Sequence, residues 1–142
     1  ILKSYTEQNM DKGEEKPLTE HVVLRRVSNP GMCLNLLADK PGIVKWLSLA
    51  AAGTVSFLYA LALFRKKGFW KKKALSLMTA GAWSNTFDRF TRGHVADYIG
   101  FKCKNKKLSS ITYNLADFFI AAGAAFLSVI SLAGTKEKSG KD

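Results

Sequence analysis

The sequence predicts an all-α polytopic membrane protein, a small bundle of transmembrane helices with a small β or loop cap on its outer side. Apolar residues make up 47% of the 142 residues, and most of them fall in three long blocks. Basic segments separate the blocks, and the chain has a net charge of +11. Lys and Arg beside long apolar stretches are typical of membrane-flanking loops, so we expect no nucleic-acid partner.

The first block, residues 46–64, has no charged side chain in 19 positions. As a helix it would rise about 28 Å, close to the roughly 30 Å apolar core of a bilayer. The alternative is a buried helix of a soluble protein, but a helix this long and apolar on all sides is unusual in so small a chain. We therefore expect this block to span the membrane.

The other two blocks are apolar but contain polar positions. Residues 74–91 are apolar as far as Phe87, and residues 111–133 are long enough to span, with polar residues only near their start. The three blocks together predict a transmembrane bundle over residues 46–133.

The segments outside the bundle give its orientation and its cap. The connection at residues 65–73 holds six Lys or Arg in nine positions, which places it in the cytoplasm, together with a polar tail at residues 134–142. Residues 1–45 then lie on the outer side as a cap. Within the cap, residues 21–27 have the composition of a strand, and the Pro and Gly of residues 28–32 indicate a turn.

Polar residues gather where the second block ends and the third begins. They are Asn85, Asp88 and Arg89 in the second block and Asn114 and Asp117 in the third. Spacings of three and four residues put each group on one helix face. Gly81 continues the first face, and a residue this small lets another helix approach closely. We therefore expect the two polar faces to meet.

Asp97 and Asp117 are the two carboxyl groups that this topology brings to the outer end of the bundle. Two carboxylates close together in a poorly hydrated site cannot both stay ionised, so the pair would share one proton. One carboxylate could then take a proton from water while the other donates one to a carbonyl oxygen, which is acid–base hydrolysis. Spacing alone leaves two alternatives open, because such residues also join helices or line the ion or proton path of a small carrier.

Cysteine and histidine give no sign of a metal site or of a nucleophile. Cys33 and Cys103 lie far apart without metal-ligand spacing, and we expect both to be free thiols. His21 and His94 have no partner at ligand spacing.

The motifs around the polar residues resemble those of the lipoprotein signal peptidases, the signal peptidase II family. The family pattern is Asn-x-x-Asp-Arg, then Val-x-Asp-Phe, then Phe-Asn-x-Ala-Asp. This chain has Asn85, Asp88 and Arg89, then Val95, Asp97 and Tyr98, then Tyr113, Asn114, Ala116 and Asp117. An earlier Asn-x-Gly motif is matched by Asn29 and Gly31. The order and spacing agree over residues 29–123.

The resemblance implies a membrane-embedded aspartic endopeptidase with four transmembrane helices, which needs no metal or cofactor. Such an enzyme removes signal peptides from diacylglyceryl-modified prolipoproteins in the bacterial cytoplasmic membrane. It cuts before the lipid-modified cysteine, at a site that faces outward. The partners it implies are the prolipoprotein, membrane lipid and, for some members, a cyclic peptide antibiotic that blocks the site.

Carried over by position, the resemblance makes Asp97 and Asp117 the catalytic pair. It gives supporting or substrate-positioning roles to Asn29, Gly31, Asn85, Asp88, Arg89 and Asn114. Three spans are visible where the family has four, so the start of residues 1–45 would be the end of a first helix, with Lys3 matching a family lysine. The chain departs from the family pattern at two aromatic positions, where it has Tyr98 and Tyr113.

Overall fold

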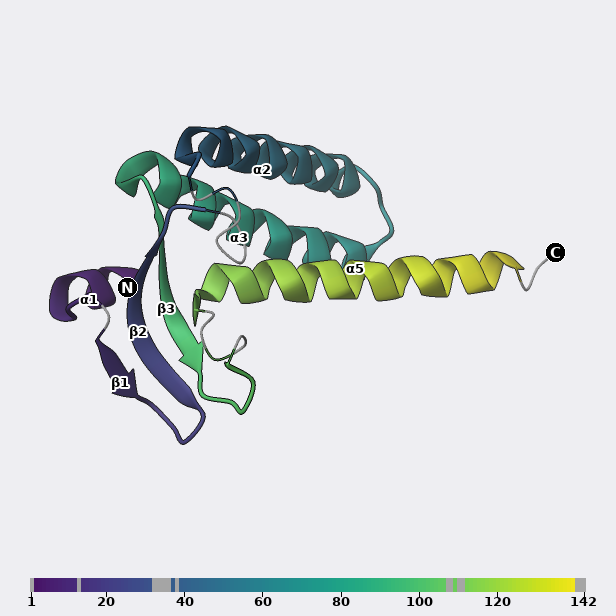
Figure 1. Cartoon of the computed structure of the whole chain (residues 1–142). Helices are drawn as coiled ribbons and strands as arrows, with labels where there is room; N and C mark the ends of the chain where they lie inside the picture. The colour runs from purple at the N-terminus through teal and green to yellow at the C-terminus, as the bar shows by residue number, and fades with distance from the viewer. Residues whose placement is uncertain are drawn as a thin grey trace.

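The computed structural model describes residues 2–12, 14–31, 37, 39–106, 109 and 112–139. Three long helices run side by side, and a small sheet with a short helix lies at one end of them (Figure 1). The elements are α1 (Leu2–Asn9), β1 (Glu15–Pro17), β2 (Val22–Asn29), α2 (Pro41–Leu63), α3 (Phe69–Arg92), β3 (Val95–Phe101), β4 (Thr112–Tyr113) and α5 (Leu115–Ser139).

Helices α2 and α3 begin and end at residues suited to helix termini. Pro41 occupies the first turn of α2, where its missing N–H costs no hydrogen bond. Gly93 ends α3 in the left-handed region (φ 79°), and its N–H donates to the carbonyl oxygen of Arg89. The chain can therefore leave α3 abruptly and enter β3 two residues later.

Two of the long helices, α2 and the segment Leu115–Gly134 of α5, are long and apolar enough to cross a membrane. Large apolar side chains on both remain exposed, among them Phe57 on α2 and Val129 on α5. Exposed apolar surface on this scale needs an apolar surrounding, which agrees with a membrane protein. Helix α3 does not pass the same test, so a third span remains a prediction.

Helix α3 packs against both α2 and α5, and its contact with α5 is made close by glycine. A Cβ atom added at Gly81 would lie 2.6 Å from the carbonyl oxygen of Ala116, and one at Gly123 would lie 2.6 Å from that of Ala74. Neither position can hold a side chain without moving the helices apart. The prediction that Gly81 allows a close helix approach is confirmed.

The all-α class is not confirmed, because the chain also forms a four-stranded antiparallel sheet in the order β1-β2-β3-β4, whereas the small β element expected beside the helices is present as this sheet. The strand predicted over residues 21–27 is confirmed as part of β2. Strand β3 was not predicted, because Val95, Ala96, Asp97 and Tyr98 are all buried. A strand covered on both faces lacks the alternation of apolar and polar residues by which strands are recognised.

Two sequence predictions meet the structure only in part. Helix α5 continues to Ser139, across the predicted start of a tail at residue 134, so the division into 1–45, 46–133 and 134–142 stays a prediction. Cys33 lies outside the described residues. Cys103 is an exposed free thiol, as expected.

Candidate active site

Asp97 lies in the middle of the sheet, on β3, and its side chain is buried. Its Oδ1 accepts a hydrogen bond from Asn114 Nδ2 at 2.9 Å, and its Oδ2 accepts one from Asn29 Nδ2 at 3.2 Å. Asn29 reaches Asp97 because Val27 of β2 pairs with Asp97, which makes Asn29 a diagonal neighbour on the same face of the sheet. Both oxygens of this carboxyl group therefore accept from neutral amides.

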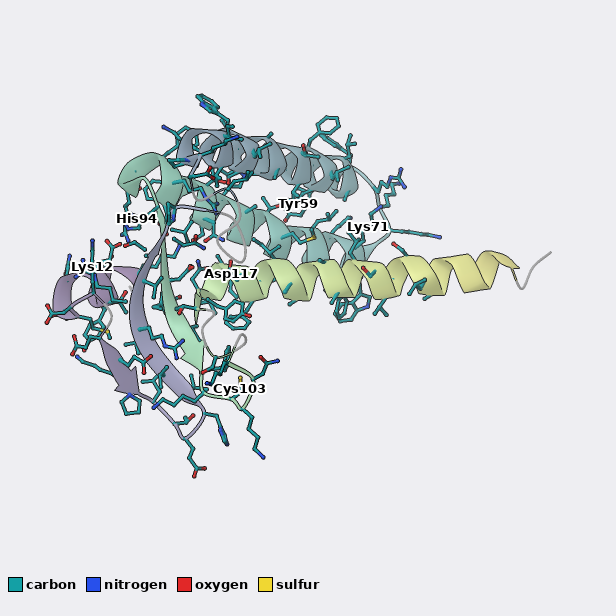
Figure 2. The ribbon with its side chains drawn as sticks, in the orientation of Figure 1. Lys12, Tyr59, Lys71, His94, Cys103 and Asp117 are labelled. Atoms are coloured by element: carbon teal, nitrogen blue, oxygen red, sulfur yellow. The ribbon has the colours of Figure 1, made fainter. Side chains whose placement is uncertain are left out.

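Asp117 is the third residue of α5 and belongs to the hydrogen-bonded start of that helix. The backbone N–H of Asn114 donates to Asp117 Oδ2 at 3.0 Å, and the backbone N–H of Asp117 donates to Asn114 Oδ1 at 3.1 Å. This reciprocal pair is a capping box, which holds both side chains at the helix N-terminus. Figure 2 shows Asp117 at the end of α5 that faces β3.

Asn114 connects the two carboxyl groups directly. Its backbone N–H bonds Asp117, while its side-chain amide donates both to Asp97 Oδ1 and, at 3.0 Å, to Asn85 Oδ1. The Nδ2 of Asn85, on α3, donates in turn to Asp117 Oδ1 at 3.2 Å. Asn114, Asn85 and Asp97 are buried and Asp117 is half-buried, so most of this network lies in the interior. The structure thus brings together four of the predicted site residues from α3, β3 and α5.

The pKa of Asp97 is raised from its ordinary value to about 7, chiefly by burial and next by the nearby charge of Asp117. The hydrogen bonds from Asn114 and Asn29 and the charge of Lys3 oppose this shift because they favour the ionised form. The pKa of Asp97 therefore lies in the neutral range, as proton transfer by a carboxyl group near neutral pH requires.

Asp88 is also buried, but it has a cationic partner. Lys3 of α1 places Nζ 2.6 Å from Asp88 Oδ2 and also donates to Ser84 Oγ at 3.1 Å. The same carboxylate oxygen accepts from the backbone N–H of Ala96 at 3.3 Å. Asp88 therefore joins α1, α3 and β3, which agrees with a structural role.

Arg89 points away from Asp88 and toward the cap. Its Nη2 donates to the carbonyl oxygen of Gly31 at 3.1 Å, and the N–H of Gly31 donates to Asn29 Oδ1 at 3.0 Å. Arg89 thereby fixes the turn that presents Asn29 to Asp97. Its guanidinium group also lies within electrostatic range of Asp97 and Asp117.

A cavity of about 780 Å³ opens beside Asp117, between α2, α3 and α5. Its polar lining includes Asn85, Arg89 and Asp117, and the rest is mainly apolar, with Leu47 of α2 and Phe118 of α5 among its walls. A few convergent polar groups in an apolar cavity are typical of a ligand site. The arrangement suits a substrate with apolar parts and one polar bond held near Asp117.

Two further contacts that hold the site could not be predicted from residue spacing. The hydroxyl oxygen of Tyr98 accepts a hydrogen bond from the backbone N–H of Leu115 at 3.1 Å, which satisfies an otherwise unpaired donor in the first turn of α5. Ser48 of α2 accepts, through its carbonyl oxygen, from the hydroxyl of Thr86 at 3.2 Å behind the cavity wall. Neither bond follows from spacing, because each joins elements far apart in the chain.

Comparison with known proteins decides between the alternatives. The family model described as "Signal peptidase (SPase) II" matches residues 1–133. This chain belongs to the signal peptidase II family. The lipoprotein signal peptidase of Nostoc punctiforme is 34% identical over 143 residues, covering 99% of this chain and 86% of that protein. The lipoprotein signal peptidase of Shigella flexneri is 33% identical over 133 residues, covering 92% and 80% respectively.

Solved structures give the same fold. A structure described as a bacterial membrane enzyme matches with a TM-score of 0.81 and 21% identity, covering 96% of this chain and 81% of the other. A second structure described in the same way has a TM-score of 0.73 and 20% identity. Membership of the signal peptidase II family makes the chain a membrane aspartic peptidase and leaves the carrier or proton-path alternative without support.

Proposed function

We propose that the chain removes signal peptides from prolipoproteins, with Asp97 and Asp117 as its catalytic pair. The observation that carries this proposal is the bridge made by Asn114, which hydrogen-bonds both carboxyl groups in one buried network. The family match and the lipoprotein signal peptidases among the relatives support the substrate class.

We assign the role of proton donor in the first step to Asp97, because its pKa is raised. Asp117 takes a proton from a water molecule whose oxygen attacks the scissile carbonyl carbon, while Asp97 donates its proton to the carbonyl oxygen. Asp117 then gives its proton to the departing amine as the C–N bond breaks, and Asp97 recovers a proton from one hydroxyl of the intermediate. The products are the carboxylic acid of the signal peptide and the free amine of the modified cysteine.

The supporting residues keep this geometry in place. Asn114 and Asn85 hold the two carboxyl groups at hydrogen-bond distance from shared amides, and Asn29 fixes the second oxygen of Asp97. Arg89 and Gly31 position Asn29, while Asp88 ties α1 to α3 and β3. These roles divide the predicted residues into two that react and six that position them.

The membrane arrangement follows from the same proposal. Helices α2, α3 and α5 cross the cytoplasmic membrane of a bacterium, with the basic segment 65–73 inside and the sheet outside. The carboxyl groups then lie at the outer ends of α3 and α5, where the acyl chains of a diacylglyceryl-modified cysteine would hold the scissile bond. The apolar cavity beside Asp117 accepts the substrate from the lipid, and a cyclic peptide antibiotic that filled it would block cleavage.

The direct test is cleavage of a diacylglyceryl-modified prolipoprotein by the purified protein in detergent. Asp97→Asn and Asp117→Asn should each lower turnover by about three orders of magnitude, because each removes one proton-transfer group. Asp11→Asn, which neutralises an exposed carboxylate of the cap, is the matched control and should keep full turnover.

Circular dichroism and size-exclusion elution should show that the variants keep the fold. Substantial turnover in either Asn variant would contradict the catalytic pair. An intact protein that cleaves no lipidated substrate would contradict the function itself.

A further inference from the structure

A second cavity adjoins the first at the outer end of the molecule. It has a volume of about 610 Å³ and is lined by Glu20, His21, Phe101, Lys102, Cys103 and Lys104. Phe101 and Cys103 also line the cavity that contains Asp117. A peptide that passes Asp117 and continues outward therefore reaches this second cavity over two shared side chains. Figure 2 shows Cys103 in the loop beyond β3, on the same side of the helices as the sheet.

The loop that carries the two lysines is held against the sheet at both of its ends. The backbone N–H of Lys102 donates to the carbonyl oxygen of His21 at 2.8 Å. Arg25 Nη1 donates to the carbonyl oxygen of Ser109 at 2.7 Å, and its Nε pairs with Glu15 at 2.7 Å. The guanidinium lies so close over Gly100 that a Cβ there would be 2.7 Å from it. These contacts hold Lys102 and Ser109 against β2 and the turn before it.

We propose that this second cavity is a subsite for the first residues of the mature lipoprotein, and that it favours acidic side chains there. The inference rests on the proposed function, because only a prolipoprotein cut beside Asp117 sends its mature end outward along this route. The cavity is lined by two ammonium groups, Lys102 and Lys104, against one carboxylate, Glu20. Lys106, two residues after Lys104, is also exposed.

The two cavities divide the substrate by polarity. The inner one has mainly apolar walls and suits the signal peptide and the acyl chains, whereas the outer one has charged walls on the water side. Exposed ammonium–carboxylate pairs contribute little each and are screened by salt. The preference should therefore amount to about fivefold at low salt and shrink at high salt.

The experiment uses three lipidated peptides that differ only in the two residues after the modified cysteine, which are Asp-Asp, Ser-Ser or Lys-Lys. The kcat/KM values of the full-length protein are measured in an uncharged detergent at low and high salt. Wild type should cleave the Asp-Asp peptide about fivefold better than the Lys-Lys peptide at low salt. Lys102→Gln/Lys104→Gln should bring this ratio close to one, and Lys102→Glu/Lys104→Glu should invert it.

The matched control is Lys67→Gln/Lys71→Gln, which removes two exposed lysines at the opposite end of α3. Figure 2 labels Lys71 there, far from Asp117. This variant should retain the wild-type ratio. Equal cleavage of the three peptides by wild type, or an unchanged ratio in the Lys102/Lys104 variants, would overturn the subsite.

An anionic lipid surface is the other ligand that two exposed lysines could meet. If the Gln variant loses activity on all three peptides equally, and only in vesicles with anionic lipid, the lysines bind headgroups and the subsite proposal is wrong. A wild-type protein that cleaves the peptides without preference overturns the subsite alone. Failure to cleave any of the three overturns the proposed function instead.

Discussion

Asp88 and Asp97 are neighbouring carboxyl groups with almost equal burial, 3% and 4% exposed, yet their surroundings differ in one respect. Asp88 has an ammonium group, Lys3 Nζ, at 2.6 Å. Asp97 has two neutral amides, from Asn114 and Asn29, and among the described residues it forms no ion pair. A cation thus compensates the buried carboxyl group of Asp88, whereas neutral amide groups hydrogen-bond the buried carboxyl group of Asp97.

The difference shows how the protein separates a structural carboxylate from one that can exchange a proton. A cation at contact distance compensates the charge of the buried Asp88 carboxylate. Amide donors pair with the oxygens of Asp97 but supply no full charge. The effects of burial and of the Asp117 charge on the pKa therefore outweigh theirs, and the pKa of Asp97 rises to about 7. The proposed catalytic role of Asp97 therefore depends on the absence of a contacting cation, and the structural role of Asp88 on its presence.

Lys3→Met removes the ammonium group beside Asp88, which then lacks a contacting cation as Asp97 does. Because it leaves a buried carboxylate unpaired, it should lower the free energy of unfolding by about 3–5 kcal/mol, measured by thermal or denaturant unfolding in detergent. The double variant Lys3→Met/Asp88→Asn is the control, and it should recover a large part of that loss. Equal stability of the single variant and wild type would mean that the ion pair of Lys3 and Asp88 contributes nothing to the free energy of unfolding.

Asp97→Asn tests the raised pKa of Asp97 through the pH dependence of the free energy of unfolding. The pKa of Asp97 is about 7 in the folded protein against an ordinary value of 3.8. Between these values the folded protein holds a proton that the unfolded chain has lost, so the free energy of unfolding falls as pH rises from about 3.8 to about 7. Removing the carboxyl group should therefore stabilise the protein above pH 7, by at most about 4 kcal/mol, and by nothing near pH 4.

The measurement for this variant is the unfolding temperature across pH 4 to 8, with Asp11→Asn as the exposed control. The control should follow the wild-type curve at every pH. A difference between Asp97→Asn and wild type that stays constant with pH would show that Asp97 keeps an ordinary pKa, and the two regions would then not differ as described.

Tyr98→Phe should have the smallest effect of the three variants, and it tests how the start of α5 is held beside the proposed catalytic pair. It removes only the hydroxyl oxygen that accepts from the Leu115 N–H, and an unsatisfied buried donor costs about 1–2 kcal/mol. Because Leu115 begins the helix that carries Asp117, kcat should fall several-fold while KM stays constant. Tyr59→Phe on α2 is the matched control and should change neither. Unchanged kcat in Tyr98→Phe would show that the capping box alone positions Asp117.

Much of the architecture was predictable because helices and membrane spans are encoded locally. The absence of charge over residues 46–64 predicted α2, and Gly81 predicted the close contact with α5. The spacing of Asn114 and Asp117 contained the capping box. Strand β3 escaped prediction because burial on both faces removed its alternation, and the ion pair of Lys3 with Asp88 joins residues too far apart in the chain for spacing to indicate it.

The sequence by itself determined the apolar helices, the basic connections and the identity of the polar residues, since periodicity and composition act over a few neighbouring residues. The contact between a carboxyl group and a cation, by contrast, arises only when distant segments pack together in the folded protein. Lys3 reaches Asp88 across 85 positions and Asn29 reaches Asp97 across 68, through packing of α1 on β3 and pairing of β2 with β3. A pKa depends on the partners and the water around a group in space, and those are set when distant segments pack together.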